Sequence, residues 1–276
     1  MRVWQHLIRG WTASCPLQNI DPVLLLEPTV YIIISAGLVA YWRLRRRFAV
    51  IVLVFSFLAY AGAIALKVAV QTFTLGAVTS AFGSVSWETG LYYGVQTSVF
   101  EVGMAYLVAR YAVSKKQMGA VDAEAYGISL AFWENGVLLG ALALLNLALT
   151  YVLISGGLIP TTAYQSLASS SPSLFYPPQQ LAFPMALGVL ERISSLLAHF
   201  AWGYLCVLAA WTRNRTFLVV ALPMGLIDAT VPFAQEVPLW EFEGLLFAVS
   251  LGFLALAWKV TAGTRRSAFQ IPAPKD

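Results

Sequence analysis

Seven long apolar stretches set the hydrophobic pattern of the chain, and short polar connections separate them. The stretches cover approximately residues 23–42, 48–70, 89–113, 125–150, 192–211, 216–233 and 239–258. An α-helix needs about 20 apolar residues to cross the hydrocarbon core of a bilayer, so each stretch is a candidate transmembrane helix. Pro223 and Pro232 lie in the short sixth stretch, which predicts a kinked or partly unwound helix. The pattern therefore predicts an all-α, polytopic membrane helix bundle with about seven transmembrane helices.

Lysine and arginine residues cluster in alternate connections of this bundle. The first, third and fifth connections and the C-terminal segment contain Arg43, Arg45, Arg46, Arg47, Arg110, Lys115, Lys116, Arg213, Arg215, Lys259, Arg265, Arg266 and Lys275. The other connections contain no lysine or arginine within residues 71–88, 156–190 and 234–239. Because cytoplasmic loops carry the excess of positive charge, the basic side is predicted to be cytoplasmic. The chain is then a multi-pass protein of the cell membrane, with its N-terminus outside and its C-terminus in the cytoplasm.

The predicted organisation is one membrane-embedded domain at residues 23–260, an outer N-terminal tail at 1–22 and a cytoplasmic tail at 261–276. Two of the outer connections are long. We interpret residues 71–87 as a re-entrant or surface segment. Residues 156–190 contain runs of serine and proline, which favour turns and extended chain.

Composition agrees with a membrane protein and excludes other classes. Hydrophobic residues make up 59% of the chain and charged residues only 11%, which is far more apolar than a soluble domain. The formal net charge of +4 comes from basic residues that flank apolar stretches, so we expect a lipid bilayer and no nucleic acid as partner. Cys15 and Cys206 are too few for a disulfide framework or a cysteine-based zinc site.

Four ionisable residues lie inside the apolar stretches: Glu101, Glu134, His199 and Asp228. A charge within a bilayer helix costs several kcal/mol unless it faces a protein interior or water, so such residues indicate function. They lie nine to fourteen residues from the predicted cytoplasmic helix ends, about 14–21 Å along each helix. We therefore expect the four side chains to converge in one layer near the middle of the membrane.

Small residues surround the four groups at helical spacing, as close helix packing in lipid requires. Taken singly, each group also has a plainer interpretation, either a protonated carboxyl bonded to a neighbouring helix or a packed, hydrogen-bonded histidine. Other charged residues are interpreted as interfacial, because they lie near predicted span ends: Lys67, Glu191, Arg192, Glu241 and Glu243.

Residues 127–135 read Gly-Ile-Ser-Leu-Ala-Phe-Trp-Glu-Asn. This resembles the Gly-Leu-Gly-Phe-Ala-x-x-Glu-Asn core motif of the PrsW-type intramembrane metalloproteases, relatives of the YhfC-type and CAAX-processing membrane proteases. Glu191-Arg192 followed by His199 is similar to the family's Arg…His helix. Asp228 and Glu101 match the positions of its His-x-x-x-Asp and Glu-Glu-x-x-Lys/Arg helices. The resemblance covers about residues 90–233.

The resemblance implies hydrolysis of membrane peptides at a site in the middle of the bilayer. It assigns Glu101 and Glu134 as catalytic residues, and His199, Asp228 and Glu134 as ligands of zinc or another divalent metal. Such a metal supplies an activated water, with a carboxylate as the base.

Three positions depart from the family pattern: Val102 replaces a second glutamate, Ala105 a basic residue and Met224 a histidine. A methionine thioether is a poor zinc ligand. The sequence thus also allows a catalytically inactive homologue that binds a membrane partner, or a proton or solute transporter. From the motif alone, the combined substitutions Met224→His and Val102→Glu are expected to raise zinc occupancy.

Overall fold

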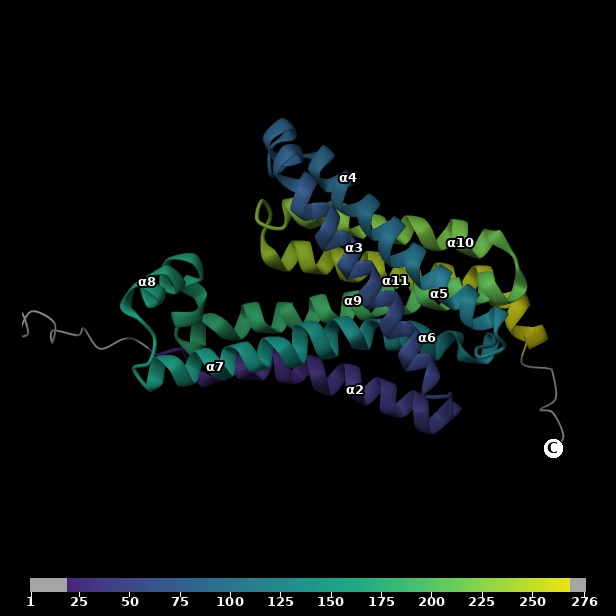
Figure 1. Ribbon diagram of the computed structural model, residues 1–276, viewed down its shortest axis with the longest axis horizontal. Coiled ribbons are helices and arrows are strands. Elements are labelled where there is room, and N and C mark those ends of the chain that lie inside the picture. Colours follow the sequence, from purple (N-terminus) through teal and green to yellow (C-terminus); the bar gives the residue numbers. More distant parts are fainter. Residues whose placement is uncertain (1–18, 269–276) are drawn as a thin grey trace, which may run out of the picture.

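The computed structural model describes residues 19–268, and this part of the chain contains helices and no strand (Figure 1). Segments labelled η are 3-10 or π-helical. In chain order the segments are η1 (Pro22–Leu25), α2 (Leu26–Arg46), α3 (Ile51–Phe82), α4 (Trp87–Gln96), η2 (Thr97–Val102), α5 (Gly103–Ser114), η3 (Ala120–Asp122), α6 (Ala123–Ala131), η4 (Phe132–Leu142), α7 (Ala143–Ser155), α8 (Thr161–Ser170), η5 (Pro172–Phe175), α9 (Pro178–Thr212), α10 (Arg215–Ala221), η6 (Leu222–Phe233) and α11 (Leu239–Ala268).

Six helical runs are long and apolar enough to cross a membrane: Pro22–Arg46, Ile51–Phe82, Ala120–Ser155, Pro178–Thr212, Arg215–Phe233 and Leu239–Thr264. They confirm the predicted all-α membrane bundle. The predicted third span is also helical, since α4, η2 and α5 follow one another without a break. It differs from the six in being more polar, because it contains Glu88, Gln96 and Glu101.

Local sequence explains where several of these segments begin and end. Asp21, Ser86 and Asn214 accept hydrogen bonds from first-turn amides of η1, α4 and α10, as helix N-caps do. Arg47 and Arg213 adopt the left-handed conformation directly after α2 and α9, and so end these helices.

The outer connections differ from two of the predictions. Residues 71–82 form no separate segment, because α3 continues through them as one 32-residue helix to Phe82, and most of their side chains are exposed. Residues 156–190 are mostly helical and contain α8, η5 and the start of α9. Proline is tolerated in the first turn of a helix, where the missing N–H would have no partner, so Pro178 begins α9. Cys15 and residues 1–18 of the predicted outer tail lie outside the described residues.

Helix α9 is the most buried of the spanning helices, and α6 and α11 pack against it most extensively. At two crossings next to the site, the helices approach so closely that glycine is required. A Cβ atom on Gly127 of α6 would lie 2.6 Å from the carbonyl oxygen of Phe200 in α9. A Cβ atom on Gly225 of η6 would lie 2.5 Å from the backbone nitrogen of Ser98 in η2. These two crossings bring η4 and α9, and η2 and η6, next to each other.

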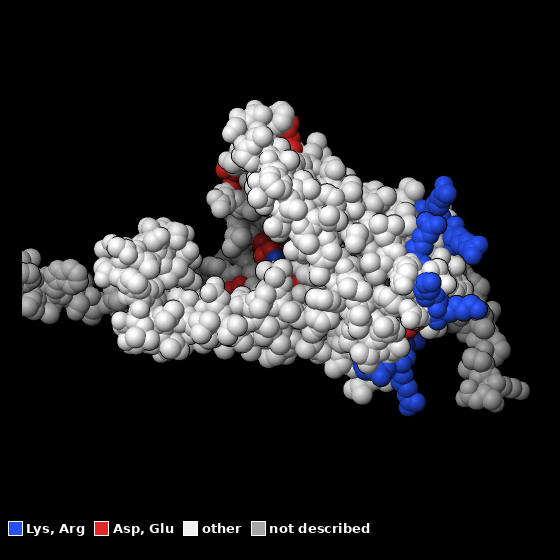
Figure 2. All heavy atoms as spheres, in the orientation of Figure 1, with Lys and Arg blue, Asp and Glu red and all other residues white. Residues whose placement is uncertain are grey.

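Apart from Lys67 and Arg192, the lysine and arginine side chains visible in Figure 2 gather at one end of the bundle, opposite α8. This end holds the connections from α2 to α3, from α5 to α6 and from α9 to α10. The arrangement places the basic connections on one side, as the sequence predicts. That this side is cytoplasmic remains a prediction from the positive-inside rule.

Candidate metal centre and its cavity

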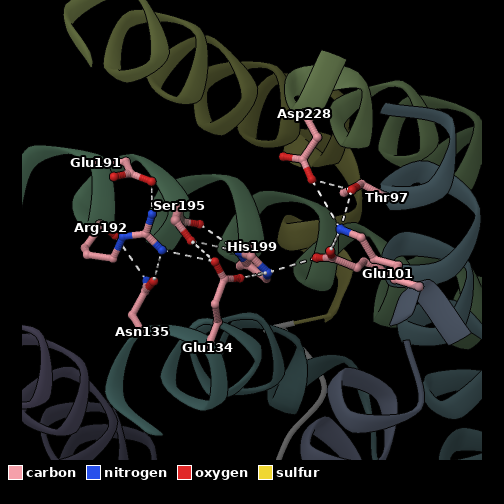
Figure 3. A network of polar contacts seen from close by, with 10 residues as sticks. Thr97, Glu101, Glu134, Asn135, Glu191, Arg192, Ser195, His199 and Asp228 are labelled. Carbon is pink, nitrogen blue, oxygen red and sulfur yellow. Dashed lines mark hydrogen bonds and ion pairs between the residues drawn. The ribbon is translucent and has the colours of Figure 1, made fainter. Parts of the chain in front are cut away.

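Three of the four predicted residues form one compact group. Glu101 of η2, Glu134 of η4 and His199 of α9 each offer a ligand atom, and these atoms lie within 4.8 Å of one another. His199 Nε2 is 2.8 Å from Glu134 Oε2 and 3.4 Å from Glu101 Oε2. Figure 3 shows the two carboxylates pointing toward the imidazole from opposite sides.

The two glutamates lie on π-helical segments, and Asp228 lies on a 3-10 segment. A π-helical turn is wider than an α-helical turn and often marks a functional site, since it shifts the direction of the side chains. No sequence signal indicates the π turns, although Pro223 and Pro232 predict the irregular helix around Asp228.

A hydrogen bond of Nδ1, the second ring nitrogen, fixes the orientation of the His199 ring. Nδ1 lies 2.9 Å from the backbone carbonyl oxygen of Ser195, which can only accept a hydrogen bond, so Nδ1 carries a proton. Nε2 is buried and has no hydrogen-bond partner of acceptable geometry among the described residues. In the neutral ring its lone pair therefore faces two carboxylates. A cation between these three groups, either a proton or a metal ion, is needed to offset that repulsion.

This donor set fits a divalent metal. Imidazole nitrogen and carboxylate oxygen are both zinc ligands, and catalytic zinc sites commonly have three protein ligands and an open position. The Nδ1 hydrogen bond to a backbone carbonyl is the contact that usually orients a metal-binding histidine. His199 Nε2, Glu101 Oε2 and Glu134 Oε2 are the atoms that would hold the ion.

Lys67 is a site residue that the sequence interpretation missed. Its Nζ donates to Glu101 Oε1 at 2.6 Å, to Thr97 Oγ1 at 2.8 Å and to Asp228 Oδ2 at 3.3 Å. The hydrophobic pattern puts Lys67 at a span end, because the apolar stretch ends near residue 70. The continuous α3 instead carries Lys67 along the interior of the bundle. The sequence signal that could have placed Lys67 inside the bundle is a helical pattern that continues without a break beyond this residue.

Asp228 lies beside the group of three and is not a member of it. Its carboxylate accepts hydrogen bonds from Lys67 and from the hydroxyl of Thr97. Figure 3 shows Asp228 and Thr97 above Glu101, whereas Glu134 and Arg192 lie on the other side of His199. Lys67 thus links Asp228 to the centre through Glu101.

Arg192 and Glu191 belong to the polar network of the site, a role that the sequence interpretation missed. Arg192 Nη1 lies 3.3 Å from Glu134 Oε1 and donates to Asn135 Oδ1 at 3.3 Å, and its other terminal nitrogen bonds Glu191. Since α9 begins at Pro178, Arg192 is fourteen residues along this helix, about 21 Å from its outer end. The Ser195 hydroxyl also donates to Glu134 Oε1, at 3.3 Å.

These groups line a cavity of about 540 Å³. Its polar lining includes Lys67, Glu101, Glu134, Glu191, Arg192, Ser195, His199, Asp228 and Glu243, and its apolar lining includes Tyr60, Ile64, Leu138, Trp202, Phe242 and Leu246. Figure 2 shows a hollow in this face of the molecule with acidic side chains inside it. Cavities of this size, mostly apolar with a few converging polar groups, are typical ligand-binding sites.

The structure does not support metal binding through residues 102 and 224. Met224 is buried in the apolar core with Val102, and neither residue lines the cavity. In a 3-10 helix, residues three apart share a face, so Gly225 and not Met224 lies on the face of Asp228. A histidine at position 224 is therefore expected to face the core rather than the metal centre.

A family model described as YhfC intramembrane metalloprotease matches residues 30–236. The chain belongs to this family. The match includes η2, η4, α9 and η6, and with them all four predicted site residues as well as Lys67. No curated protein and no solved structure matches the chain. Membership of this family implies a divalent metal and membrane-embedded peptide substrates.

Proposed function

We propose that the protein hydrolyses peptide bonds of membrane-embedded substrates at a site formed by Glu101, Glu134 and His199 around one divalent metal ion, zinc in the first instance. The observation that carries this proposal is the buried Nε2 of His199, which lies 2.8 Å from Glu134 Oε2 and 3.4 Å from Glu101 Oε2. When bound, the metal supplies a nucleophilic water at neutral pH and polarises the substrate carbonyl.

The two carboxylates have different surroundings, which suggests different roles. Glu134 is fixed through Oε1 by Arg192 and Ser195, so its Oε2 is held toward His199. Glu101 has Lys67 on Oε1 and leaves Oε2 toward the centre. We assign Glu134 and His199 to holding the metal throughout. Glu101, whose Oε2 also faces the centre, would hold it more weakly and accept the proton of the attacking water, passing it to the leaving amine.

Asp228 is assigned to positioning. The resemblance names it as a metal ligand, but its contacts are with Lys67 and Thr97. Asp228 keeps the Lys67 ammonium next to Glu101. The lysine in turn offsets the cost of burying the Glu101 carboxylate in a mostly apolar cavity, since an opposite charge lies close to it.

A second candidate is a homologue that binds membrane peptides without cleaving them. It is favoured by the ion pairs of Lys67 and Arg192, which already compensate carboxylates of the cavity without any metal. His199 is also the one histidine within residues 19–268, so the centre offers a single nitrogen ligand.

The deciding experiment measures zinc per chain in the purified protein, reconstituted in lipid nanodiscs, together with cleavage of a transmembrane peptide. The enzyme proposal expects one zinc per chain, with zinc and cleavage both lost in His199→Ala, and with cleavage lost in Glu101→Gln. Glu241→Gln is the matched control, because Glu241 is exposed and does not line the cavity. A wild-type protein that holds no zinc and cleaves nothing contradicts the enzyme proposal and favours the binding protein.

A further inference from the structure

Glu243 is a buried carboxyl in the cavity that neither the metal centre nor its ion pairs use. It is the fifth residue of α11, only 3% of its surface is exposed, and it lines the same cavity as the metal centre. No hydrogen bond reaches its Oε2 from any residue of the described chain. A buried carboxyl without a partner is costly, so such a group indicates a ligand that the cavity receives.

Every other carboxylate of the cavity lining has a cationic partner within the described residues. Lys67 pairs with Glu101 and Asp228, and Arg192 pairs with Glu134 and Glu191. Glu243 takes part in none of these pairs. The cavity therefore has five carboxylates and two permanently charged cations, and the carboxylate left over is Glu243.

The position of Glu243 shows which part of a substrate it can meet. Lys259, near the basic end of α11, follows it by sixteen residues, which corresponds to about 24 Å of helix. Glu243 is thus near the end of the cavity opposite the basic connections. Leu239, Phe242 and Leu246 line the cavity around it and provide an apolar wall.

We propose that Glu243 forms a subsite for an ammonium group of the substrate peptide, either its free amino terminus or a lysine side chain. The proposal rests on the proposed peptide-binding function and adds a substrate class to it. An ammonium group supplies the charge-assisted hydrogen bond that Oε2 lacks, and the apolar wall accommodates the stem of a lysine or the first apolar residues of the peptide. The substrate then enters with a positively charged end toward the outer side of the bundle.

The test measures binding and needs neither metal nor cleavage. Three fluorescent apolar peptides share one parent sequence. The first has a free amino terminus, the second has an acetylated terminus, and the third has an acetylated terminus and one added lysine next to it. Their affinities for the protein in phosphatidylcholine nanodiscs are compared in metal-free buffer. We expect the free-amine or the lysine peptide to bind about tenfold more tightly than the acetylated peptide. The better of the two identifies the source of the ammonium group.

Substitutions on α11 connect that preference to Glu243. Glu243→Gln keeps the size of the side chain and is expected to abolish the preference, whereas Glu243→Asp keeps the charge and is expected to retain part of it. Glu241→Gln, two residues away and exposed, is the matched control and is expected to leave the preference unchanged. Unfolding midpoints of all variants are measured alongside, so that loss of folding is distinguished from loss of the subsite.

Three results would overturn the proposal. One is equal binding of the three peptides, and another is a preference that survives Glu243→Gln in a folded protein. The third is a preference that disappears when phosphatidylethanolamine is added to the nanodiscs, because the subsite would then hold a lipid headgroup. Since zinc content and cleavage do not enter this test, its failure leaves the proposed hydrolase intact, and failure of the hydrolase leaves this test valid.

Discussion

The substitution Gly127→Ala tests whether the α6–α9 crossing determines the geometry of the metal centre. The new Cβ atom would lie 2.6 Å from the carbonyl oxygen and 2.9 Å from the Cα atom of Phe200, whereas ordinary contacts begin at 3.4 Å. Both contacts are with backbone atoms, so no side-chain rotation can relieve them. The helices must separate by about 0.8 Å at this point, and overpacking of this kind costs about 1–3 kcal/mol.

The same displacement of α6 from α9 is expected to move Glu134 away from His199 at the proposed centre. Glu134 follows Gly127 by seven residues along the same helical run, and Phe200 is adjacent to His199. The distance of 2.8 Å between Glu134 Oε2 and His199 Nε2 is therefore expected to lengthen by a comparable amount. A misplacement of about 1 Å at a catalytic centre can lower the rate about 100-fold.

Cleavage rate and zinc occupancy measure the effect on the proposed centre, and denaturant-unfolding midpoints of the detergent-solubilised protein measure the effect on stability. Gly37→Ala is the control, because its Cβ atom would have no neighbour within 4 Å. Alanine is a better helix former than glycine, so this control is expected to be neutral or more stable by up to about 1 kcal/mol. If Gly127→Ala is as stable as Gly37→Ala and binds zinc as well as the wild type, the crossing does not position the centre and the reasoning is refuted.

Three further tests concern the buried lysine, the apolar core and the topology. Lys67→Met leaves Glu101 and Asp228 without a cation, so the unfolding free energy is expected to fall by about 3–5 kcal/mol, whereas Lys115→Met at the exposed basic end should change it little. Met224→His combined with Val102→Glu is expected to lower stability and not to raise zinc occupancy, because both positions lie in the apolar core; a measured gain of zinc would show that they face the centre. Single cysteines at Arg45 and Lys115 should react with a membrane-impermeant reagent from the same side of the membrane, and labelling from opposite sides would contradict the predicted topology.

The sequence alone was sufficient for the membrane class and the family, and it singled out the three residues that cluster at the proposed centre. Glu101, Glu134 and His199 could be recognised because an ionisable residue in an apolar helix is unusual wherever its partners lie. The positions of the spans and of the basic connections also follow from local composition, since bilayer thickness sets the helix length. The family match over residues 30–236 then confirmed the resemblance based on short motifs.

The tertiary structure decided which charged residues complete the site. Lys67 is 34 residues from Glu101 and 161 from Asp228, and Arg192 is 58 from Glu134. In the sequence these two cations look like ordinary interfacial residues, because nothing local shows what a side chain will face. Packing also turned Asp228 toward Lys67 and left Glu243 buried without an ion-pair partner among the described residues. Such pairings depend on helix crossings between segments far apart in the chain, and hydrophobic periodicity contains no information about those crossings.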